Sequence, residues 1–283
     1  MTDLDLSYLH ARKLLLPAYE AINLVLVGCG GTGSFLARGV ATVARLLIDK
    51  FQKDVSVYFF DPDTVEEKNC YRQNFCPAEI GRNKAETLAF RLGTVWGLGI
   101  TAIPQPFSAQ SIPYGGLKSW LTVLIGCVDN AAARREIRKA CPPGNSSSAR
   151  TWWLDCGNHQ ASGQVLIGCG SDKPKKDPFE LPGYCSWLPL PTERHPELLE
   201  DLAIDPSPAS GEGGGEEDTT RLSCADLAML DSQGLAVNQV IAAQAADYLV
   251  RLLLTRDLQK CATYLNLAAG SSRSVYITPE TTG

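Results

Sequence analysis

Residues 23–28 and the glycines that follow them constrain the fold of this chain more than any other feature. The residues between Asn23 and Gly28 are all apolar, as expected for a strand buried on both faces of a parallel sheet. After the glycines, residues 35–47 carry apolar side chains at helical spacing. A second apolar run, residues 55–60, follows. This order predicts a βαβ unit with parallel strands.

The alternation of apolar runs and helical stretches continues along the chain. We expect strands at 121–126, 151–155, 164–168, 262–267 and 274–278, and helices at 84–92, 130–141 and 233–254. The predicted fold is therefore α/β: a Rossmann-like, doubly wound and mostly parallel sheet with C-terminal mixed or antiparallel strands. Residues 171–222 are rich in Pro, Gly, Asp and Glu and show little periodicity, which is typical of a functional loop or of disorder.

The composition is that of an ordinary globular protein. The chain has 283 residues, of which 45% are hydrophobic and 20% charged, and its net charge is −5. Such a charge gives no general attraction to nucleic acid or to an anionic membrane, so we expect neither partner. The first residues lack the pattern of a signal peptide, and we expect a cytoplasmic protein. No two of the ten cysteines are spaced as Cys-x-x-Cys, so we expect no structural zinc.

The glycine cluster lies between a strand and a helix, where a loop can bind phosphates on helix N-terminal amides. It consists of Gly28, Gly30, Gly31 and Gly33. No Gly-Lys-Ser/Thr follows, which excludes a Walker-type loop. The pattern fits a dinucleotide dehydrogenase nearly as well as an ATP-binding enzyme.

Two aspartates, Asp61 and Asp63, end the second predicted strand. An acidic residue at this position can accept hydrogen bonds from ribose hydroxyls. Either aspartate can instead be a turn residue beside Pro62.

The residues beyond the second strand distinguish the two nucleotides. They include Asn69, Arg72, Gln73 and Lys84. A dehydrogenase does not need such a set. An enzyme that cleaves ATP at the α-phosphate does, because charge gathers on the phosphate oxygens in the transition state and fixed donors must meet it.

At these residues the sequence resembles the ThiF/MoeB/ubiquitin-activating-enzyme family. The family pattern is Gly-x-Gly-Gly-x-Gly, Asp-x-Asp-Thr-Val, Asn-x-x-Arg-Gln, Gly-x-x-Lys and then Asp-Asn after a further strand. All five motifs occur here in this order, and the last is Asp129-Asn130. The resemblance covers residues 23–168 well and the later helix loosely.

The resemblance implies adenylation of the C-terminal carboxylate of a ubiquitin-like partner by ATP. It assigns the four glycines to the phosphates and Asp63 to the ribose. It also assigns Asn69, Arg72 and Lys84 to the triphosphate, with support from Gln73. Asp129 would help to hold Mg²⁺, although it can alternatively cap the helix that starts near Ala131.

The resemblance also divides the chain. Residues 1–170 form the adenylation core, 171–222 a flexible crossover loop, and 223–283 the helix and strands that complete the domain and its partner-binding surface. Some relatives transfer the acyl group to a cysteine in or after this loop. The candidates here are Cys224 and Cys185. His195 can be imagined as a base, but a lone histidine in a polar loop is typically solvent-facing.

Relatives supply an arginine from a neighbouring protomer to the triphosphate, and Arg12 is the plausible equivalent. This favours a homodimer. The Leu-Ser-Cys-Ala-Asp segment and the missing zinc motif are most similar to bacterial ThiF-like proteins of PRTRC systems.

Two alternatives to the adenylating enzyme remain open. An NAD(P)- or FAD-dependent Rossmann oxidoreductase would leave four residues unexplained: Asn69, Arg72, Lys84 and Asp129. A non-catalytic scaffold that binds a ubiquitin-like protein would not need them intact.

Overall fold

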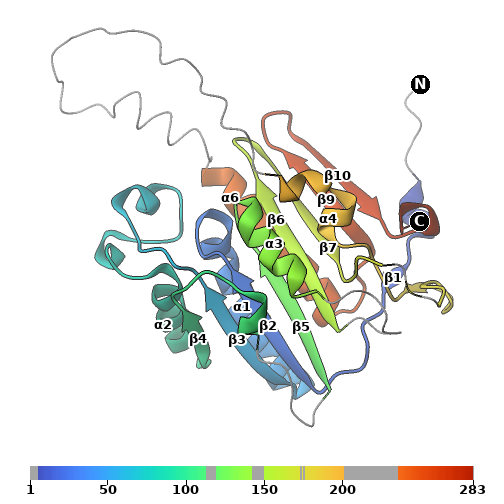
Figure 1. Cartoon of the computed structure of the whole chain (residues 1–283), viewed down its shortest axis with the longest axis horizontal. Helices are drawn as coiled ribbons and strands as arrows, with labels where there is room; N and C mark the ends of the chain where they lie inside the picture. The colour runs from blue at the N-terminus through green and yellow to red at the C-terminus, as the bar shows by residue number, and fades with distance from the viewer. Residues whose placement is uncertain are drawn as a thin grey trace, which may run out of the picture.

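One sheet of eight strands forms the centre of the molecule, in the order β10-β9-β7-β6-β5-β2-β3-β4 (Figure 1). The computed structural model describes residues 6–112, 119–141, 150–172, 174, 176–200 and 235–282. The strands of the sheet are β2 (Ala21–Val27), β3 (Asp54–Phe60), β4 (Ile100–Ile103), β5 (Trp120–Gly126), β6 (Thr151–Asn158), β7 (Ser162–Gly168), β9 (Lys260–Asn266) and β10 (Ser271–Tyr276).

The sheet has a parallel half and an antiparallel half. The strands from β4 to β6 pair in parallel, and those from β6 to β10 pair in antiparallel fashion. The central parallel strands end in register, because Val27 lies opposite both Phe60 and Gly126, and Gly126 lies opposite Asp155. This aligns the residues that follow each strand along one edge. The predicted fold class is confirmed.

Helices cover both faces of this sheet (Figure 1). Along β2, Leu24 and Leu26 pack into the larger core with α1 and α6, whereas Val25 and Val27 pack into a smaller core with α3. This alternation is what a strand buried on both faces requires. The helices are α1 (Gly31–Phe51), α2 (Lys84–Trp96), α3 (Ala131–Lys139), α4 (Pro191–Arg194), α6 (Leu235–Leu253) and α7 (Pro279–Thr282).

The segment after β7 carries more structure than its sequence predicts. Within residues 176–200, β8 (Tyr184–Cys185) pairs in parallel with β1 (Lys13–Leu14), and α4 is followed by the 3₁₀ helix η5 (Pro196–Leu199). The periodicity of two-residue strands and single helical turns is too short to detect. Residues 201–222 of the predicted crossover loop lie outside the described residues, and so does Cys224.

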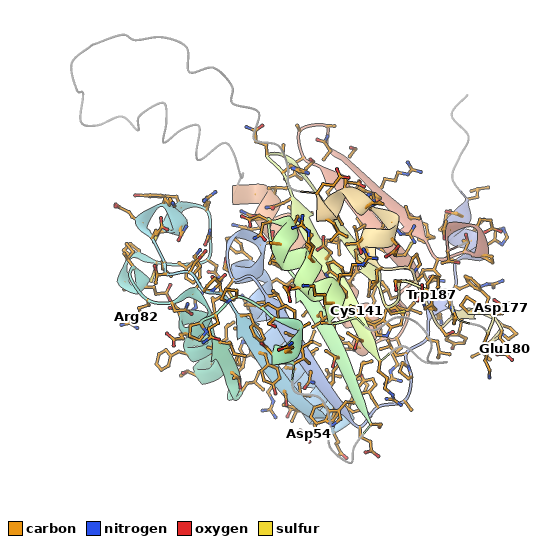
Figure 2. The ribbon with its side chains drawn as sticks, in the orientation of Figure 1. Asp54, Arg82, Cys141, Asp177, Glu180 and Trp187 are labelled. Atoms are coloured by element: carbon orange, nitrogen blue, oxygen red, sulfur yellow. The ribbon has the colours of Figure 1, made fainter. Side chains whose placement is uncertain are left out.

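Apolar side chains lie mainly in the interior of this fold and charged side chains mainly on its surface. Figure 2 labels Cys141 and Trp187, which are buried, and Asp54, Arg82, Asp177 and Glu180, which are exposed. Among the described residues, none of the helices combines the length and the apolar character needed to cross a bilayer.

Candidate active site

A cavity of about 630 Å³ opens where β2, β3 and β5 end. Strand β3 pairs with one side of β2, and β5 pairs with the other side of β2. The strand order therefore reverses at the end of β2, beside the cavity. Open α/β sheets bind ligands at such a switch point. The predicted site residues that line the cavity are Gly28, Gly30, Gly31, Asp61, Asp63, Asn69, Arg72, Gln73, Lys84 and Asp129.

The N-terminus of α1 forms one wall of the cavity. The helix begins at Gly31 after Gly30, with no side-chain cap and no acidic residue in its first turn. Its first N–H groups have no partners within the helix, and the helix dipole adds partial positive charge there. This wall is suited to an anion.

Gly28 and Gly33 pack closely against neighbouring backbone atoms of the loop and of the end of β5. Gly28 has φ of +89°, and a Cβ on it would lie 2.5 Å from the carbonyl oxygen of Cys127. A Cβ on Gly33 would lie 1.9 Å from the Gly28 carbonyl oxygen. Gly33 is not among the lining residues. Only glycine can occupy these two positions without moving the loop away from the end of β5.

The two aspartates after β3 differ in exposure. Asp61 is buried, and its Oδ2 accepts from the Cys29 N–H at 2.6 Å while its Oδ1 accepts from the Asp63 N–H at 2.9 Å. Burial raises the pKa of the Asp61 carboxyl despite these two hydrogen bonds, which lower it. Asp61 therefore braces the glycine loop and the turn after β3. The side chain of Asp63 is 64% exposed and faces the cavity.

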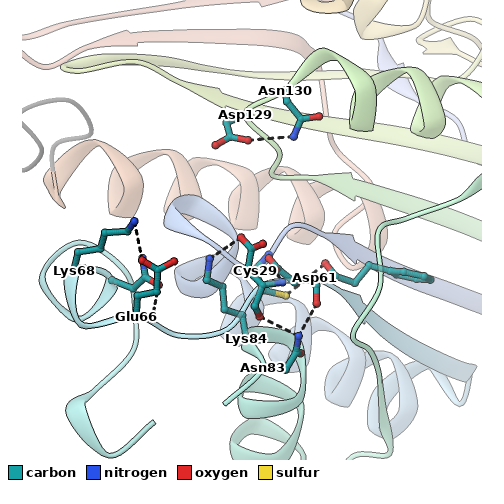
Figure 3. Close-up of polar contacts among 11 residues, drawn as sticks. Cys29, Asp61, Glu66, Lys68, Asn83, Lys84, Asp129 and Asn130 are labelled. Atoms are coloured by element: carbon teal, nitrogen blue, oxygen red, sulfur yellow. Dashed lines mark hydrogen bonds and ion pairs between the residues drawn. The ribbon is translucent and has the colours of Figure 1, made fainter. Parts of the chain in front are cut away.

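Lys84 is the first residue of α2 and is almost completely buried. Its Nζ donates to Asp63 Oδ2 at 3.0 Å (Figure 3). Asn83 caps the helix and donates from Nδ2 to the carbonyl oxygens of Asp61 and Asp63 at 2.9 and 3.0 Å. The start of α2 is thereby fixed to the end of β3, which holds the Lys84 ammonium at the cavity.

The residues from Asn69 to Gln73 lie on the 3₁₀ helix η2 (Glu67–Tyr71) and its C-terminal end. Asn69 is buried, and its Oδ1 accepts from the Glu66 N–H at 2.9 Å. The Asn69 carbonyl oxygen accepts from the N–H groups of Arg72 and Gln73. Gln73 is buried, and no described residue donates to its Oε1. Asn69 thus shapes the turn that brings Arg72 and Gln73 to the cavity.

Asp129 follows β5 on the opposite wall, and it is exposed. The helix cap is Asn130, whose Oδ1 accepts from the Ala133 N–H at 2.8 Å. The alternative role of Asp129 as a helix cap is therefore filled by its neighbour. Asp129 Oδ1 accepts from Asn130 Nδ2 at 3.3 Å, as Figure 3 shows. The Asp129 carboxylate thus faces the cavity.

A second cavity of about 680 Å³ adjoins the first. Both are lined by Val128, Asp129, Asn130 and Asn158. From this junction the second cavity runs along the start of β7 to Tyr264 and Glu200. Asp129 therefore lies where the two spaces meet.

Three further polar groups at the site were not predicted from the sequence. Asn238 on α6 is fully buried and contacts residues of the first cavity. Arg134 and Asp155 form a buried ion pair, with Nε to Oδ1 at 3.2 Å. A polar residue at one of the mainly apolar positions on the buried face of α6 is the signal that could have identified Asn238.

His195 was expected to face solvent, but both of its ring nitrogens have side-chain partners. Its Nδ1 lies 2.8 Å from Glu197 Oε1, and its Nε2 lies 2.6 Å from the Tyr264 hydroxyl. These contacts attach the segment after α4 to β9. The backbone N–H of Arg12 donates to the Ile277 carbonyl oxygen at 2.8 Å. Within its own chain, Arg12 does not line the cavity.

Cys185 is buried in β8, and its Sγ donates to the Trp187 carbonyl oxygen at 2.9 Å. Burial raises the pKa of this thiol to about 11. Since the thiolate is the nucleophile, we expect iodoacetamide to modify Cys185 about a hundredfold more slowly than the exposed Cys76 in the folded protein. Mass spectrometry of peptides after timed labelling measures both rates.

Labelling in urea is the control, because both thiols should then react at similar rates. Equal rates in the folded protein would show that Cys185 is accessible and reactive.

The ThiF family model matches residues 15–280. The chain is 27% identical over 158 residues to ubiquitin-like modifier-activating enzyme 5 of Oryza sativa subsp. japonica, and 30% identical over 134 residues to that of Dictyostelium discoideum. These matches cover 50% and 42% of this chain but only 34% and 32% of the relatives, so the chain matches about a third of their length.

Two solved structures show the same fold. Crystalline PaaA superposes with a TM-score of 0.53 at 15% identity, over 90% of this chain and 64% of PaaA. MccB of E. coli, in its structure with ATP, gives a TM-score of 0.53 at 15% identity, over 91% of this chain and 64% of MccB. At this identity the likeness establishes the arrangement of the sheet and helices alone.

Proposed function

The chain belongs to the ThiF family, and we propose that it is an adenylating enzyme that uses ATP to activate the C-terminal carboxylate of a ubiquitin-like or sulfur-carrier-like protein. The observation that carries this proposal is the convergence of three features on one cavity. These are the uncapped N-terminus of α1, the buried Lys84 and the exposed Asp129. A second cavity meets the first at Asp129.

In this proposal the triphosphate of ATP lies against the start of α1, Arg72 and Lys84. Arg72 offers a planar set of donors, and Lys84 a compact charge. Both would stabilise the charge that develops on the α-phosphate. The exposed oxygens of Asp63 are suited to ribose hydroxyls, whereas both oxygens of Asp61 are used within the protein. Asp61 would then act on ATP indirectly, through the loop that it braces.

The donor set also fits Mg²⁺, which binds through one or two carboxylates together with substrate phosphates. Asp129 is the carboxylate that we assign to it. When bound, Mg²⁺ would neutralise charge on the phosphates. Asp129 would hold it at the junction of the two cavities.

The second cavity is assigned to the C-terminal tail of the partner protein. Its carboxylate would reach the α-phosphorus at the junction beside Asp129 and Asn158. The carboxylate oxygen attacks the α-phosphorus in line, the bond to the β-phosphate breaks, and pyrophosphate leaves. An acyl-adenylate remains. No general base is required because the nucleophile is already ionised, so catalysis rests on positioning and on charge stabilisation.

The relatives support the proposal. The two curated relatives are activating enzymes for ubiquitin-like modifiers, and E. coli MccB has been crystallised with ATP and with MccA. The oxidoreductase alternative leaves Lys84 and Asp129 without a role. The scaffold alternative predicts that the chain binds ATP or the partner protein but does not adenylate the partner's carboxylate.

The test is ATP–pyrophosphate exchange with candidate ubiquitin-like partners. We expect exchange that requires the free C-terminal carboxylate of the partner and falls by about a hundredfold in Asp129→Asn, because charge stabilisation of this kind typically contributes that much. A partner with an amidated C-terminus is the matched substrate control.

The outcomes separate the alternatives. Absence of exchange despite ATP binding would support the scaffold, and preference for NADH over ATP would support the oxidoreductase. The variant Cys224→Ala, at a position outside the described residues, would then separate adenylation alone from transfer to a thioester.

A further inference from the structure

Asn238 lies in the first described turn of α6, and its carboxamide lies between three parts of the polypeptide that are distant in sequence. It is fully buried. Its Oδ1 accepts from the Thr32 hydroxyl at 3.3 Å and from Asn158 Nδ2, and its Nδ2 donates to the Arg72 carbonyl oxygen at 3.3 Å. A buried amide with both ends bonded fixes the relative position of the groups that it joins.

All three partners of Asn238 line the candidate nucleotide cavity. Thr32 lies in the first turn of α1, Arg72 ends η2, and Asn158 ends β6. Asn238 itself is not among the lining residues. It therefore acts on the cavity through other residues.

Asn238 also accounts for Gly31. A Cβ on Gly31 would lie 2.7 Å from Asn238 Oδ1 and 2.9 Å from its Nδ2. A carbon atom does not come this close to an oxygen or nitrogen atom unless the two are covalently linked. Any side chain at position 31 would therefore displace either the Asn238 carboxamide or the start of α1. In contrast, a Cβ on Gly30 would meet only Gln73 Nε2, at 3.7 Å. The requirement for glycine at position 31 thus comes from packing against α6.

We propose that Asn238 is a positioning residue of the nucleotide site. It holds the first turn of α1 against the Arg72 segment and the end of β6, so that their donors converge on one bound triphosphate. This inference rests on the proposed binding of ATP. It adds α6, from the C-terminal part of the chain, to the structure that determines ATP affinity.

The first test compares Asn238→Ala with Gln239→Ala, which removes an exposed amide from the next position of the same helix. We expect Asn238→Ala to weaken ATP binding by about tenfold to a hundredfold, because two or more buried hydrogen bonds are lost. Gln239→Ala should leave it unchanged. Isothermal titration calorimetry with ATP measures the affinity, and thermal unfolding shows whether each variant is folded.

Asn238→Asp provides a variant of the same size. It retains acceptors for Thr32 and Asn158 but places an oxygen against the Arg72 carbonyl oxygen, so we expect it to weaken ATP binding as well. In the exchange reaction both Asn238 variants should raise the KM for ATP more than they lower kcat. A merely structural role would lower the amount of active protein and leave KM unchanged.

The second test is a double-mutant cycle with Gly31→Ala. In the wild-type background this change forces the added methyl against the Asn238 amide, and we expect about tenfold weaker ATP binding or more. In the Asn238→Ala background the space is free, so the same change should cost much less. A cost that is equal in both backgrounds would show that Asn238 does not place the loop.

The outcomes distinguish this inference from the proposed function. If the wild-type protein does not bind ATP, both are wrong. If the wild-type protein binds ATP and the folded Asn238 variants bind it equally well, the inference alone is overturned.

Discussion

Replacing Lys84 by methionine is expected to lower the rate of ATP–pyrophosphate exchange by about 10²- to 10³-fold, the usual effect of removing one fixed donor from a developing anion. Methionine keeps most of the buried stem of Lys84, which is only 6% exposed. The partner that loses its ion pair, Asp63, remains largely solvated. We therefore expect the fold to persist, and thermal unfolding checks this.

Lys50→Met is the matched control, because Lys50 lies exposed in the last turn of α1 and does not line the cavity. Its exchange rate should equal that of the wild-type protein. Exchange by Lys84→Met within about twofold of wild type would remove Lys84 from the catalytic set, since an effect this small is far below that of a donor to the transition state.

Replacing Arg134 by methionine is expected to have the largest effect on stability, about 3–5 kcal/mol, because it leaves the Asp155 carboxylate buried without its ion-pair partner. Asp155 is fully buried, and its Oδ2 already has no hydrogen-bond partner among the described residues. Such a loss is a large part of the roughly 5–15 kcal/mol that stabilises a typical domain. Urea unfolding of the variant and wild type measures the difference.

The change should also make stability depend on pH in a defined direction. Burial already raises the pKa of Asp155, and the Arg134 guanidinium opposes this. Without Arg134 the pKa rises further, so the folded state binds the proton more tightly than the unfolded state. In the variant, the contribution of Asp155 to the free energy of unfolding should therefore be largest at low pH and fall as the pH rises from the ordinary value of 3.8 through the raised pKa.

Arg138→Met is the matched control on the same helix. Arg138 donates to Glu193 Oε1 at 2.6 Å, but both side chains are partly exposed, so the change should cost about 0–1 kcal/mol. The double change Arg134→Met and Asp155→Leu should recover much of the lost stability, because it removes the buried charge. An effect of Arg134→Met as small as that of Arg138→Met would contradict the prediction.

Most of the parallel half of the sheet could be predicted from the sequence, because its central strands are long apolar runs that end at glycine or aspartate. Residues 55–60, for example, agree with β3 within one residue. Strand β4 was not predicted, since it has only four residues and lies at an edge. Strands β1 and β8 have two residues each, and their pairing depends on tertiary contacts.

Some residues of the candidate site could likewise be predicted from the sequence, whereas others could not. Local motifs were enough to single out Lys84 and Asp129, both of which line the cavity. The sequence could not show which of two neighbouring aspartates turns inward, because that depends on the Cys29 N–H across the loop. Nor could it pair Asn238 with Thr32, which lies 206 residues away. Roles in ATP and Mg²⁺ binding, the homodimer, the cytoplasmic location, the domain bounds and the relation to PRTRC proteins stay predictions.

The packing of α6 on α1 bears on whether the first part of the chain is separable. The sequence predicts an adenylation core that ends near residue 170, but β7 pairs with β9, and α6 packs against α1, β6 and β7. A truncation after β7 would expose the apolar face of α1 and leave β7 as an open edge, which invites aggregation. It would also remove Asn238. The glycine loop at the start of α1 thus depends on α6 and β9 for its packing, and transplanting the loop motif alone would not transfer the cavity that it lines.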